Sequence, residues 1–445
     1  MPRSDSPASE RVTSYAWLVV GLLWFVALLN YLDRLTVTSM RDWIVADIPM
    51  SDARFGLLTS VFLWVYGVCS PMGGFLADRY SRKWVILVSL AVWSIVTWWT
   101  GHVHTFEALL LVRAIMGVSE ACYIAAALAL IADYHSGPTR SLATGLHQSG
   151  LYAGAALGGA GGWIAAEHGW RVAFTQFGAI GVGYALVIGF VLRDRPPAAE
   201  AKDPSGATVA PRKASFVEAL RTLLRTPAFW VLMVYMALAA MAFWLVNGWL
   251  PVYLQDRFVG WSPEQLGPTM TDFLPSAWLR AGAIYKGNAG LYATVPVQIA
   301  SFVGVVFGGI VADRWSRTNI RGRVILPAIG FMLAGPFLVL LAITSNFGVA
   351  LLAMVVFGLG RGISDANIMP ILCQVVDSHY RATAYGILNL VGVTIGGGMI
   401  YVGGYLRDRQ VGLPVPFAIA GCGLLLAGIL LLAIRPDQRA PAVAE

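Results

Sequence analysis

The chain has 445 residues, of which 57% are hydrophobic and 12% are charged. A charged fraction of roughly 25% is usual for soluble domains, so this chain has about half of it. Together with a mean hydropathy of +0.68, the composition excludes an ordinary soluble protein and predicts an integral membrane protein. The formal net charge of +7 comes mainly from basic residues between apolar segments, which gives no reason to expect nucleic acid as a partner.

The apolar segments are long enough to cross a membrane, because about 20 residues span a hydrocarbon core of roughly 30 Å. The first segment contains Asp33 and lacks a small-residue cleavage site, so we expect a retained span and not a signal peptide. Twelve spans are predicted, at residues 16–38, 54–76, 84–101, 106–132, 141–166, 171–192, 228–254, 288–312, 323–343, 347–375, 382–404 and 414–434.

Lys and Arg are distributed unevenly between the two sides of these spans. The two tails and the loops after the even-numbered spans carry 20 of the 31, whereas the other loops carry 8. Basic loops stay on the cytoplasmic side, so both termini are predicted to be cytoplasmic. The expected location is a bacterial inner (plasma) membrane, which the chain crosses many times.

A polar segment rich in proline and alanine, residues 193–227, separates the first six spans from the last six. Its composition is typical of a disordered linker, and its end has the apolar spacing of a helix lying in the membrane interface. Residues 256–286 are too polar to span and long for a loop, so an extracytoplasmic cap or gate is expected there. The expected divisions are a tail at 1–15, six-helix bundles at 16–192 and 228–434, the linker between them, and a tail at 435–445.

The two halves repeat each other. GGFLADRYSRK at 73–83 matches GGIVADRWSRT at 308–318, and the sequence Ser-Glu-Ala at 119–121 matches Ser-Asp-Ala at 364–366. Such a repeat indicates a duplicated six-helix unit with a binding site where the units meet. Gly74 and Gly309 are expected to let helices approach closely. The charged residues of the two loops are expected to form gating ion pairs: Asp78, Arg79, Arg82, Asp313, Arg314 and Arg317.

On these motifs the whole chain resembles the Major Facilitator Superfamily, whose fold is all-α with twelve transmembrane helices in two six-helix bundles. NYLDR at 30–34, RAIMGVSEA at 113–121, WLPVYL at 249–254 and GILNLVG at 386–392 are most similar to the anion:cation symporters of sugar acids and other organic anions. Spinster-type transporters share the first-span acid and the Arg/Glu pair, and are the second resemblance. The resemblance implies that Asp33 couples to protons and that Glu120 lies nearer the substrate.

Ionisable residues inside spans are expensive and usually mark a transport pathway. Asp33 and Arg34 are adjacent. Arg113 and Glu120 lie seven residues apart on one helical face, so we expect both to look into the same cavity. We expect Asp33 and Glu120 to carry protons, and Arg34 and Arg113 either to stabilise the charged forms of these acids or to bind a substrate carboxylate. The alternative is a structural ion pair of Arg113 with Glu120.

Further polar residues in the spans are candidates for substrate contact. Arg361 and Asp365, four residues apart, are either a self-contained salt bridge or part of gating or binding. His147 is more simply a packing residue than a proton relay. The remaining substrate-binding candidates are Gln148 and Asn389, which occupy equivalent positions of the repeat, together with Tyr152, Asn247 and Trp249. The resemblance implies that Asn389 contacts substrate.

The function expected is proton-coupled symport, importing a small organic anion such as a sugar acid by alternating access. Alternatives are a Spinster-type transporter of lysolipids or other amphiphiles, uptake of a neutral sugar or glycoside, and a transporter-like receptor. The glycine-rich runs lack the Lys-Ser/Thr of a phosphate-binding loop, and the four cysteines lack the paired spacing of a disulfide or metal site. We therefore expect no enzyme, no cofactor and no metal, and a monomer whose partners are protons, a small molecule and the lipid bilayer.

Overall fold

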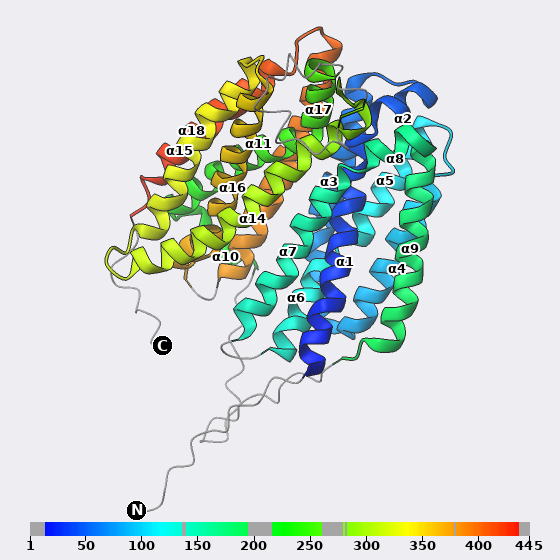
Figure 1. Ribbon diagram of the computed structural model, residues 1–445. Helices are drawn as coiled ribbons and strands as arrows, with labels where there is room; N and C mark the ends of the chain where they lie inside the picture. Colours follow the sequence, from blue (N-terminus) through cyan, green and yellow to red (C-terminus); the bar gives the residue numbers. More distant parts are fainter. Residues whose placement is uncertain are drawn as a thin grey trace, which may run out of the picture.

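The computed structural model describes residues 14–135, 139–194, 216–259, 279–280, 283–377 and 380–435. Almost all of them are helical, and the helices form two bundles that correspond to the two halves of the sequence (Figure 1). The N-terminal half contains α1 (Ser14–Ser39), α2 (Arg41–Asp47), α3 (Asp52–Arg79), α4 (Arg82–Thr100), α5 (Phe106–Glu120), α6 (Tyr123–Tyr134), α7 (Arg140–Gly158), α8 (Gly161–His168) and α9 (Trp170–Val191).

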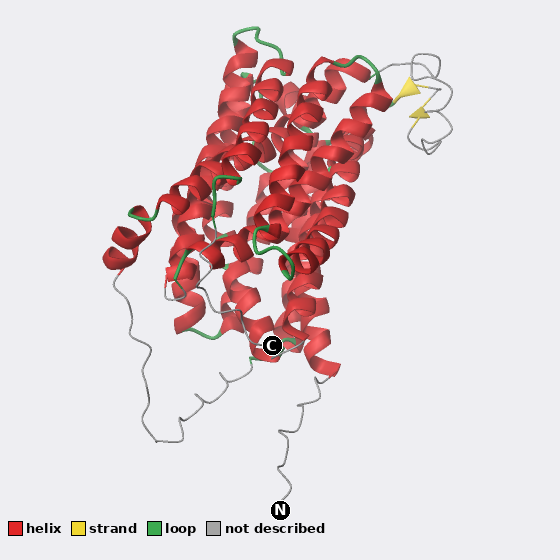
Figure 2. Cartoon of the chain, turned by 90° about the vertical axis from the view of Figure 1, so that its left-hand side faces the viewer, coloured by secondary structure: helices red, strands yellow, loops and turns green. Residues whose placement is uncertain are grey.

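The C-terminal half repeats this arrangement with longer helices. The short helix α10 (Phe216–Leu224) precedes it, in the segment predicted to lie in the membrane interface. The other elements are α11 (Pro227–Phe258), β1 (Leu279–Arg280), β2 (Ala283–Ile284), η3 (Lys286–Asn288), α14 (Ala289–Ser316), α15 (Gly322–Ile343), α16 (Phe347–Val375), α17 (Arg381–Asp408) and α18 (Pro414–Leu431). The strands β1 and β2 pair antiparallel and lie beside the helices (Figure 2).

Several helices begin at a side chain that accepts a hydrogen bond from the first turn. Ser51 accepts from the amide of Arg54, Ser81 from Trp84 and Thr105 from Ala108. These caps replace hydrogen bonds that the first backbone N–H groups of a helix cannot make internally. They fix where α3, α4 and α5 start.

Eleven segments of the described residues are long and apolar enough to cross a membrane. The predicted span 141–166 is not among them, because it corresponds to the glycine-rich α7 and the short α8. The predicted span 106–132 is among them, as the segment Phe106–Tyr134. Within it a short turn separates α5, which ends at Glu120, from α6, which begins at Tyr123. Glu120 therefore sits at a break between two helices.

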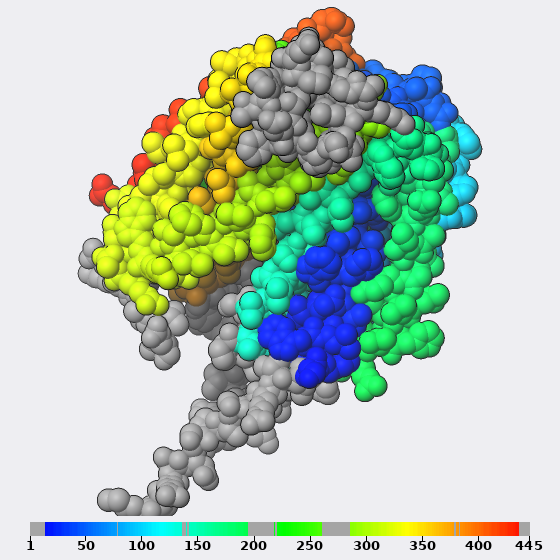
Figure 3. All heavy atoms as spheres, viewed as in Figure 1, coloured from blue at the N-terminus to red at the C-terminus, as the bar shows by residue number. Residues whose placement is uncertain are grey.

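The two bundles touch at the end away from the chain termini, here called the closed end (Figures 1 and 3). On one side α7 meets α14, where the hydroxyl of Thr294 donates to the carbonyl of Ala156 over 2.7 Å. A Cβ added at Gly159 would lie 2.4 Å from the carbonyl oxygen of Gly290. On the other side the hydroxyl of Ser60 in α3 donates to the carbonyl of Gly397 in α17 over 2.6 Å. Backbones thus meet directly, which larger residues would prevent.

Charged residues add an ionic network at the closed end. Arg407 of α17 lies 2.7 Å from the Asp52 carboxylate of α3 and also pairs with Asp256 of α11. Arg41 pairs with Asp52, and Lys286 pairs with Asp42 of α2. Two of these ion pairs, Arg407 with Asp52 and Lys286 with Asp42, join the two halves of the chain. The network therefore holds the bundles together. Most of the segment 256–286, predicted to form a cap or gate, lies outside the described residues.

The repeated loop motif sits at the other end of the molecule. Arg82 pairs with Asp133, and Arg323 lies 2.8 Å from Asp313. Arg79, Arg314 and Arg317 are exposed, and the side chain of Asp78 lies outside what the structure describes. The gating role of these residues stays a prediction.

The glycines of this motif correct one expectation. A Cβ at Gly74 or Gly309 would meet nothing within 4 Å, so these two glycines are not at a helix contact. The preceding glycines, Gly73 and Gly308, do lie at helix contacts. A Cβ at Gly73 would lie 2.4 Å from the carbonyl oxygen of Ala121, and a Cβ at Gly308 would lie 2.7 Å from the Cα of Ile363. Successive residues point about 100° apart around a helix, so the predicted contact was one residue out of register.

Candidate functional site

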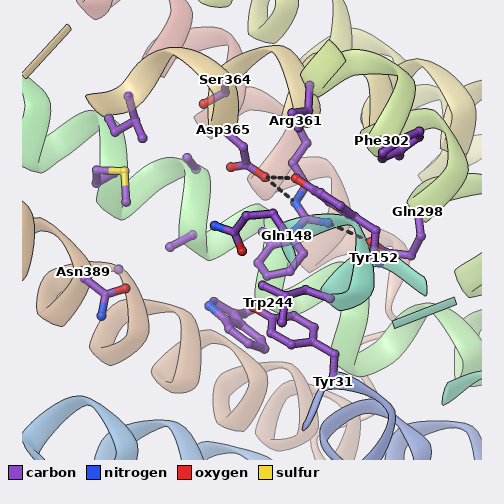
Figure 4. A pocket seen from close by; sticks show the side chains of 18 of the residues that line it. Tyr31, Gln148, Tyr152, Trp244, Gln298, Phe302, Arg361, Ser364, Asp365 and Asn389 are labelled. Carbon is purple, nitrogen blue, oxygen red and sulfur yellow. Dashed lines mark hydrogen bonds and ion pairs between the residues drawn. The ribbon is translucent and has the colours of Figure 1, made fainter. Parts of the chain in front are cut away.

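A cavity of about 620 Å³ lies between the two bundles. Its walls come from α1, α3 and α7 of the N-terminal half and from α11, α14, α15, α16, α17 and α18 of the C-terminal half (Figure 4). It lies on the side of the closed end that faces the chain termini, where the bundles are apart (Figure 1). This volume falls in the range of roughly 300–1,000 Å³ that is usual for small-molecule sites.

Six of the residues singled out from the sequence lie in the cavity wall: Arg34, Gln148, Tyr152, Arg361, Asp365 and Asn389. In Figure 4, Gln148 and Tyr152 of α7 lie near Arg361 and Asp365 of α16, whereas Asn389 belongs to a separate helix, α17. The cavity therefore receives one arginine from each bundle. Each arginine also has a carboxylate partner.

In the N-terminal bundle, the partner of Arg34 is Glu120. Nη2 of Arg34 lies 2.8 Å from Oε2 of Glu120, and both side chains are buried, at 3% and 0% exposure. The guanidinium is surrounded by the rings of Tyr31, Phe62 and Tyr66, whose centroids are 4.6 to 4.9 Å away. Aromatic faces stabilise a cation, most of all where water is excluded. Arg34 is thus a fixed positive charge at the cavity wall.

Asp33 and Arg113 lie behind this pair and do not line the cavity. Oδ2 of Asp33 accepts a hydrogen bond of 3.1 Å from Thr97 of α4, and its Oδ1 has no partner within the described residues. Arg113 donates to the carbonyl of Leu58 over 3.5 Å and lies over the ring of Phe62. An ionised carboxylate buried without a cation bonded to it is costly, so Asp33 has the surroundings of a group that takes up a proton.

The expected arrangement of Arg113 and Glu120 is therefore wrong in one respect. They share a helix, but neither is in the cavity wall, and no ion pair joins them among the described residues. The reason is that α5 ends at Glu120, which turns to Arg34 of α1, while Arg113 reaches α3. Spacing along one helix cannot reveal a stronger partner on another.

In the C-terminal bundle, Arg361 is bonded to Asp365 and to Gln298. Its Nε lies 3.4 Å from Oδ2 of Asp365, and its Nη1 donates to Oε1 of Gln298 over 3.2 Å. Gln298 in turn donates to Oδ1 of Asn247 over 3.2 Å. Asn247 thus acts behind the wall, holding Gln298.

Two other candidates lie away from the cavity. Trp249 is fully buried and donates to the carbonyl of Ile400, which ties α11 to α17. His147 is also buried, with Nε2 2.9 Å from the hydroxyl of Tyr123. Their positions are those of packing residues, and substrate contact by Trp249 stays a prediction.

The rest of the C-terminal wall is mostly apolar. Asn367 of α16 donates to the carbonyl oxygens of Ile363 and Gly308 and does not line the cavity. Phe302 and Val306 of α14 are 43% and 47% exposed in it. Other apolar wall residues of this half are Met236, Phe243, Trp244, Phe331, Phe357, Ile368 and Leu424.

Sequence reasoning missed several residues of the site. Thr97, which bonds Asp33, belongs to no sequence motif. Gln298 is a single polar residue in an apolar span, and the free-energy cost of placing an amide in the membrane is the one sequence signal that could have identified it. Tyr31 and Tyr66, which enclose Arg34, look like ordinary membrane tyrosines. Within the described residues, no group of three or more His, Cys, Asp and Glu side chains could hold a metal ion.

A family comparison decides the class of the protein. Residues 23–400 and 283–445 match the model of the Major Facilitator Superfamily. The chain belongs to the Major Facilitator Superfamily. Among curated members, it is similar to protein spinster homolog 1 of Bos taurus, with 28% identity over 433 residues, covering 92% of this chain and 78% of the relative. The Homo sapiens homolog 1 is 28% identical over 424 residues, covering 91% and 76%.

A solved structure of another protein shows the same fold. It is a bacterial homolog of the human lysosomal transporter Spinster, in an inward-facing and unoccupied conformation. The TM-score is 0.71 and the identity 22%, with 94% of this chain and 95% of that chain covered. This chain is therefore a multi-pass membrane protein with a transporter fold and not that of an enzyme. The Spinster name on these relatives agrees with the second of the two resemblances read from the motifs.

Proposed function

We propose that this Major Facilitator chain is a proton-coupled transporter of an amphipathic organic anion, such as a lysolipid, and works by alternating access. The observation that carries the proposal is the division of the cavity wall. Arg34 and Arg361 offer a positive charge from each bundle, whereas α11, α14 and α18 offer a largely apolar surface. An anionic headgroup suits the arginines, which bind carboxylates and phosphates by paired hydrogen bonds. An acyl chain suits the apolar wall.

Asp33 is proposed as the main proton carrier, with Glu120 as a second. Asp33 lacks an ion-pair partner within the described residues, whereas Glu120 is bonded to Arg34. Protonating Glu120 would weaken that ion pair, and Arg34 would then be free to hold the substrate anion. Proton uptake and anion binding would in this way favour each other.

The proposal includes an orientation. We take α7 with α8 as the remaining one of twelve spans and both termini as cytoplasmic, in accord with the bias of Lys and Arg. The cavity then opens to the cytoplasm, and the closed end faces outward. A bacterial inner membrane and a monomeric state complete the proposal.

A sugar acid is the second candidate, with symport into the cell as the reaction. It is favoured by the amides of Gln148 and Asn389, which lie in the wall on opposite bundles and could hydrogen-bond hydroxyl groups. The cavity of about 620 Å³ accommodates either class of substrate. The two candidates differ in whether an apolar chain is needed.

Transport by the purified protein in proteoliposomes distinguishes them. With a proton gradient imposed, we expect accumulation of lysophosphatidylglycerol but not of monoacylglycerol, which has the chain without the charge, nor of glucuronate, which has the charge without the chain. Accumulation of glucuronate alone would favour the second candidate. Equal transport of monoacylglycerol would contradict the role given to the arginines.

A further inference from the structure

The guanidinium of Arg361 in the cavity wall is held from several sides. It lies 3.6 Å from the centroid of the Phe243 ring and 5.6 Å from that of Tyr152. Nη1 is bonded to Gln298, and Nε faces Asp365. Among the described residues, Nη2 makes no hydrogen bond. The guanidinium is thus fixed in orientation, with donors left over.

Asp365 is held less firmly than its partner. Its side chain is 45% exposed, against 13% for Arg361. The same oxygen, Oδ2, faces Nε of Arg361 at 3.4 Å and accepts a hydrogen bond of 3.2 Å from the hydroxyl of Tyr152. The ion pair is single, long and within one helix, and pairs of this kind contribute little stability. Asp365 can therefore leave Arg361 for the water in the cavity.

Tyr152 and Asp365 belong to different bundles. Tyr152 is on α7 and Asp365 on α16, so their hydrogen bond crosses the cavity (Figure 4). The other bonds between bundles described above, from Thr294 and Ser60, lie at the closed end. A change at Asp365 therefore reaches the opposite bundle directly.

We propose that Asp365 occupies the place of the substrate's anionic group in the empty transporter, and gives up Arg361 when substrate enters. A carboxylate or phosphate can approach the guanidinium with two oxygens in its plane, which a single oxygen at 3.4 Å does not do. Asp365 then turns to the cavity and its hydrogen bond to Tyr152 breaks. Substrate binding thereby releases a contact between the bundles. This inference rests on the proposed function, because it requires an anionic substrate.

Binding to the purified, full-length protein tests the inference. The probes are lysophosphatidic acid and palmitate, which carry a phosphate and a carboxylate, and monopalmitoylglycerol, which is uncharged. Asp365→Asn removes the competing anion, so we expect both anionic probes to bind at least about 5-fold tighter and the neutral probe to bind as before. The matched control is Glu218→Gln, which makes the same charge change at an exposed site of α10, away from the cavity wall, and should change nothing.

A milder variant covers the case in which Asp365→Asn does not fold. Tyr152→Phe removes only the hydroxyl group whose hydrogen bond to Asp365 has to break when substrate binds. The affinity for anions should therefore rise by about 2- to 10-fold, which corresponds to the net free energy of one hydrogen bond. Unchanged or weaker anion binding by the folded variants, with wild-type protein binding the same probes, would overturn the inference and leave the proposed function standing. Failure of the wild type and both variants to bind any anionic probe would overturn both.

Discussion

Arg34 of α1 is bonded to Glu120 at the end of α5, at 2.8 Å, and not to Asp33, its neighbour in the chain. Asp33 points to Thr97 of α4 instead. One pair of adjacent residues thus serves two separate centres. Arg34 faces the cavity with a counter-charge, whereas Asp33 is buried behind it without one.

Glu120→Gln is expected to destabilise the protein strongly. It leaves the buried guanidinium of Arg34 without a counter-charge, and breaking a buried pair from one side costs about 3–5 kcal/mol. The apparent Tm in detergent should fall, and the double variant with Arg34→Gln should regain much of the loss because neither charge remains. A single variant as stable as the wild type would show that the pair is not essential to the fold.

Asp33→Asn is expected to separate transport from the proton gradient. Asparagine keeps the shape and the contact with Thr97 but cannot carry a proton. In proteoliposomes, accumulation driven by the gradient should be lost, while exchange of labelled for unlabelled substrate should continue. Thr97→Val is the control, since it keeps the carboxyl group and should keep coupling. Full accumulation by Asp33→Asn would rule out Asp33 as the coupling site.

Gly73→Ala and Gly74→Ala form a matched pair with opposite expected outcomes. A Cβ at Gly73 would lie 2.4 Å from a backbone oxygen of Ala121, whereas one at Gly74 would meet nothing. Gly73→Ala should lower the free energy of unfolding by about 1–3 kcal/mol through overpacking. Gly74→Ala should be neutral or slightly stabilising, because alanine favours a helix. Thermal unfolding in detergent measures both; equal destabilisation would show that the helices are spaced differently.

The closed end should loosen in acid. Burial alone would raise the pKa of Asp42, but its bonds to Lys286 and Arg41 outweigh this and hold the pKa below its ordinary value. A carboxyl with a lowered folded pKa stabilises the structure above its unfolded pKa of about 3.9, and this contribution is lost as the pH falls through the folded pKa. The closed conformation should therefore lose population below about pH 4.

Spin labels at Glu107 and Ser345, exposed at the closed end of the two bundles, measure this opening by electron–electron distance. Asp42→Asn should broaden the distance distribution already at neutral pH and reduce the response to acid. Glu218→Gln, an exposed position of α10 at the opposite end, serves as control. An unchanged distribution and an unchanged acid response in Asp42→Asn would exclude this residue from the closure.

The sequence predicted the two-bundle fold because hydropathy and the internal repeat report on single helices and on their duplication. It predicted the charges of the site for the same kind of reason, since an ionisable residue in an apolar run is visible without a structure. Partners between helices were not visible. That Glu120 pairs with Arg34, and that Gly73 rather than Gly74 is packed, depends on how each helix is rotated against its neighbour.

The span over α7 shows the limit of hydropathy. Its sequence is rich in glycine and carries His147, Gln148 and Ser149, because the helix packs on α1 and also lines the cavity. Composition alone underrates such a helix. The internal repeat, in which Gln148 and Asn389 occupy equivalent positions, is a better signal that this segment is a helix of the bundle.

The same helices, α3, α7, α14 and α17, contribute to the closed end and to the cavity, but through different atoms. The contact of Gly159 with Gly290 consists of main-chain atoms, whereas the cavity wall consists of side chains. Substitutions of wall side chains that make no bond to the other bundle are therefore expected to leave this backbone contact as it is. Relatives with the same glycines at this contact are expected to share this close approach of the bundles, even where the side chains of their cavities differ.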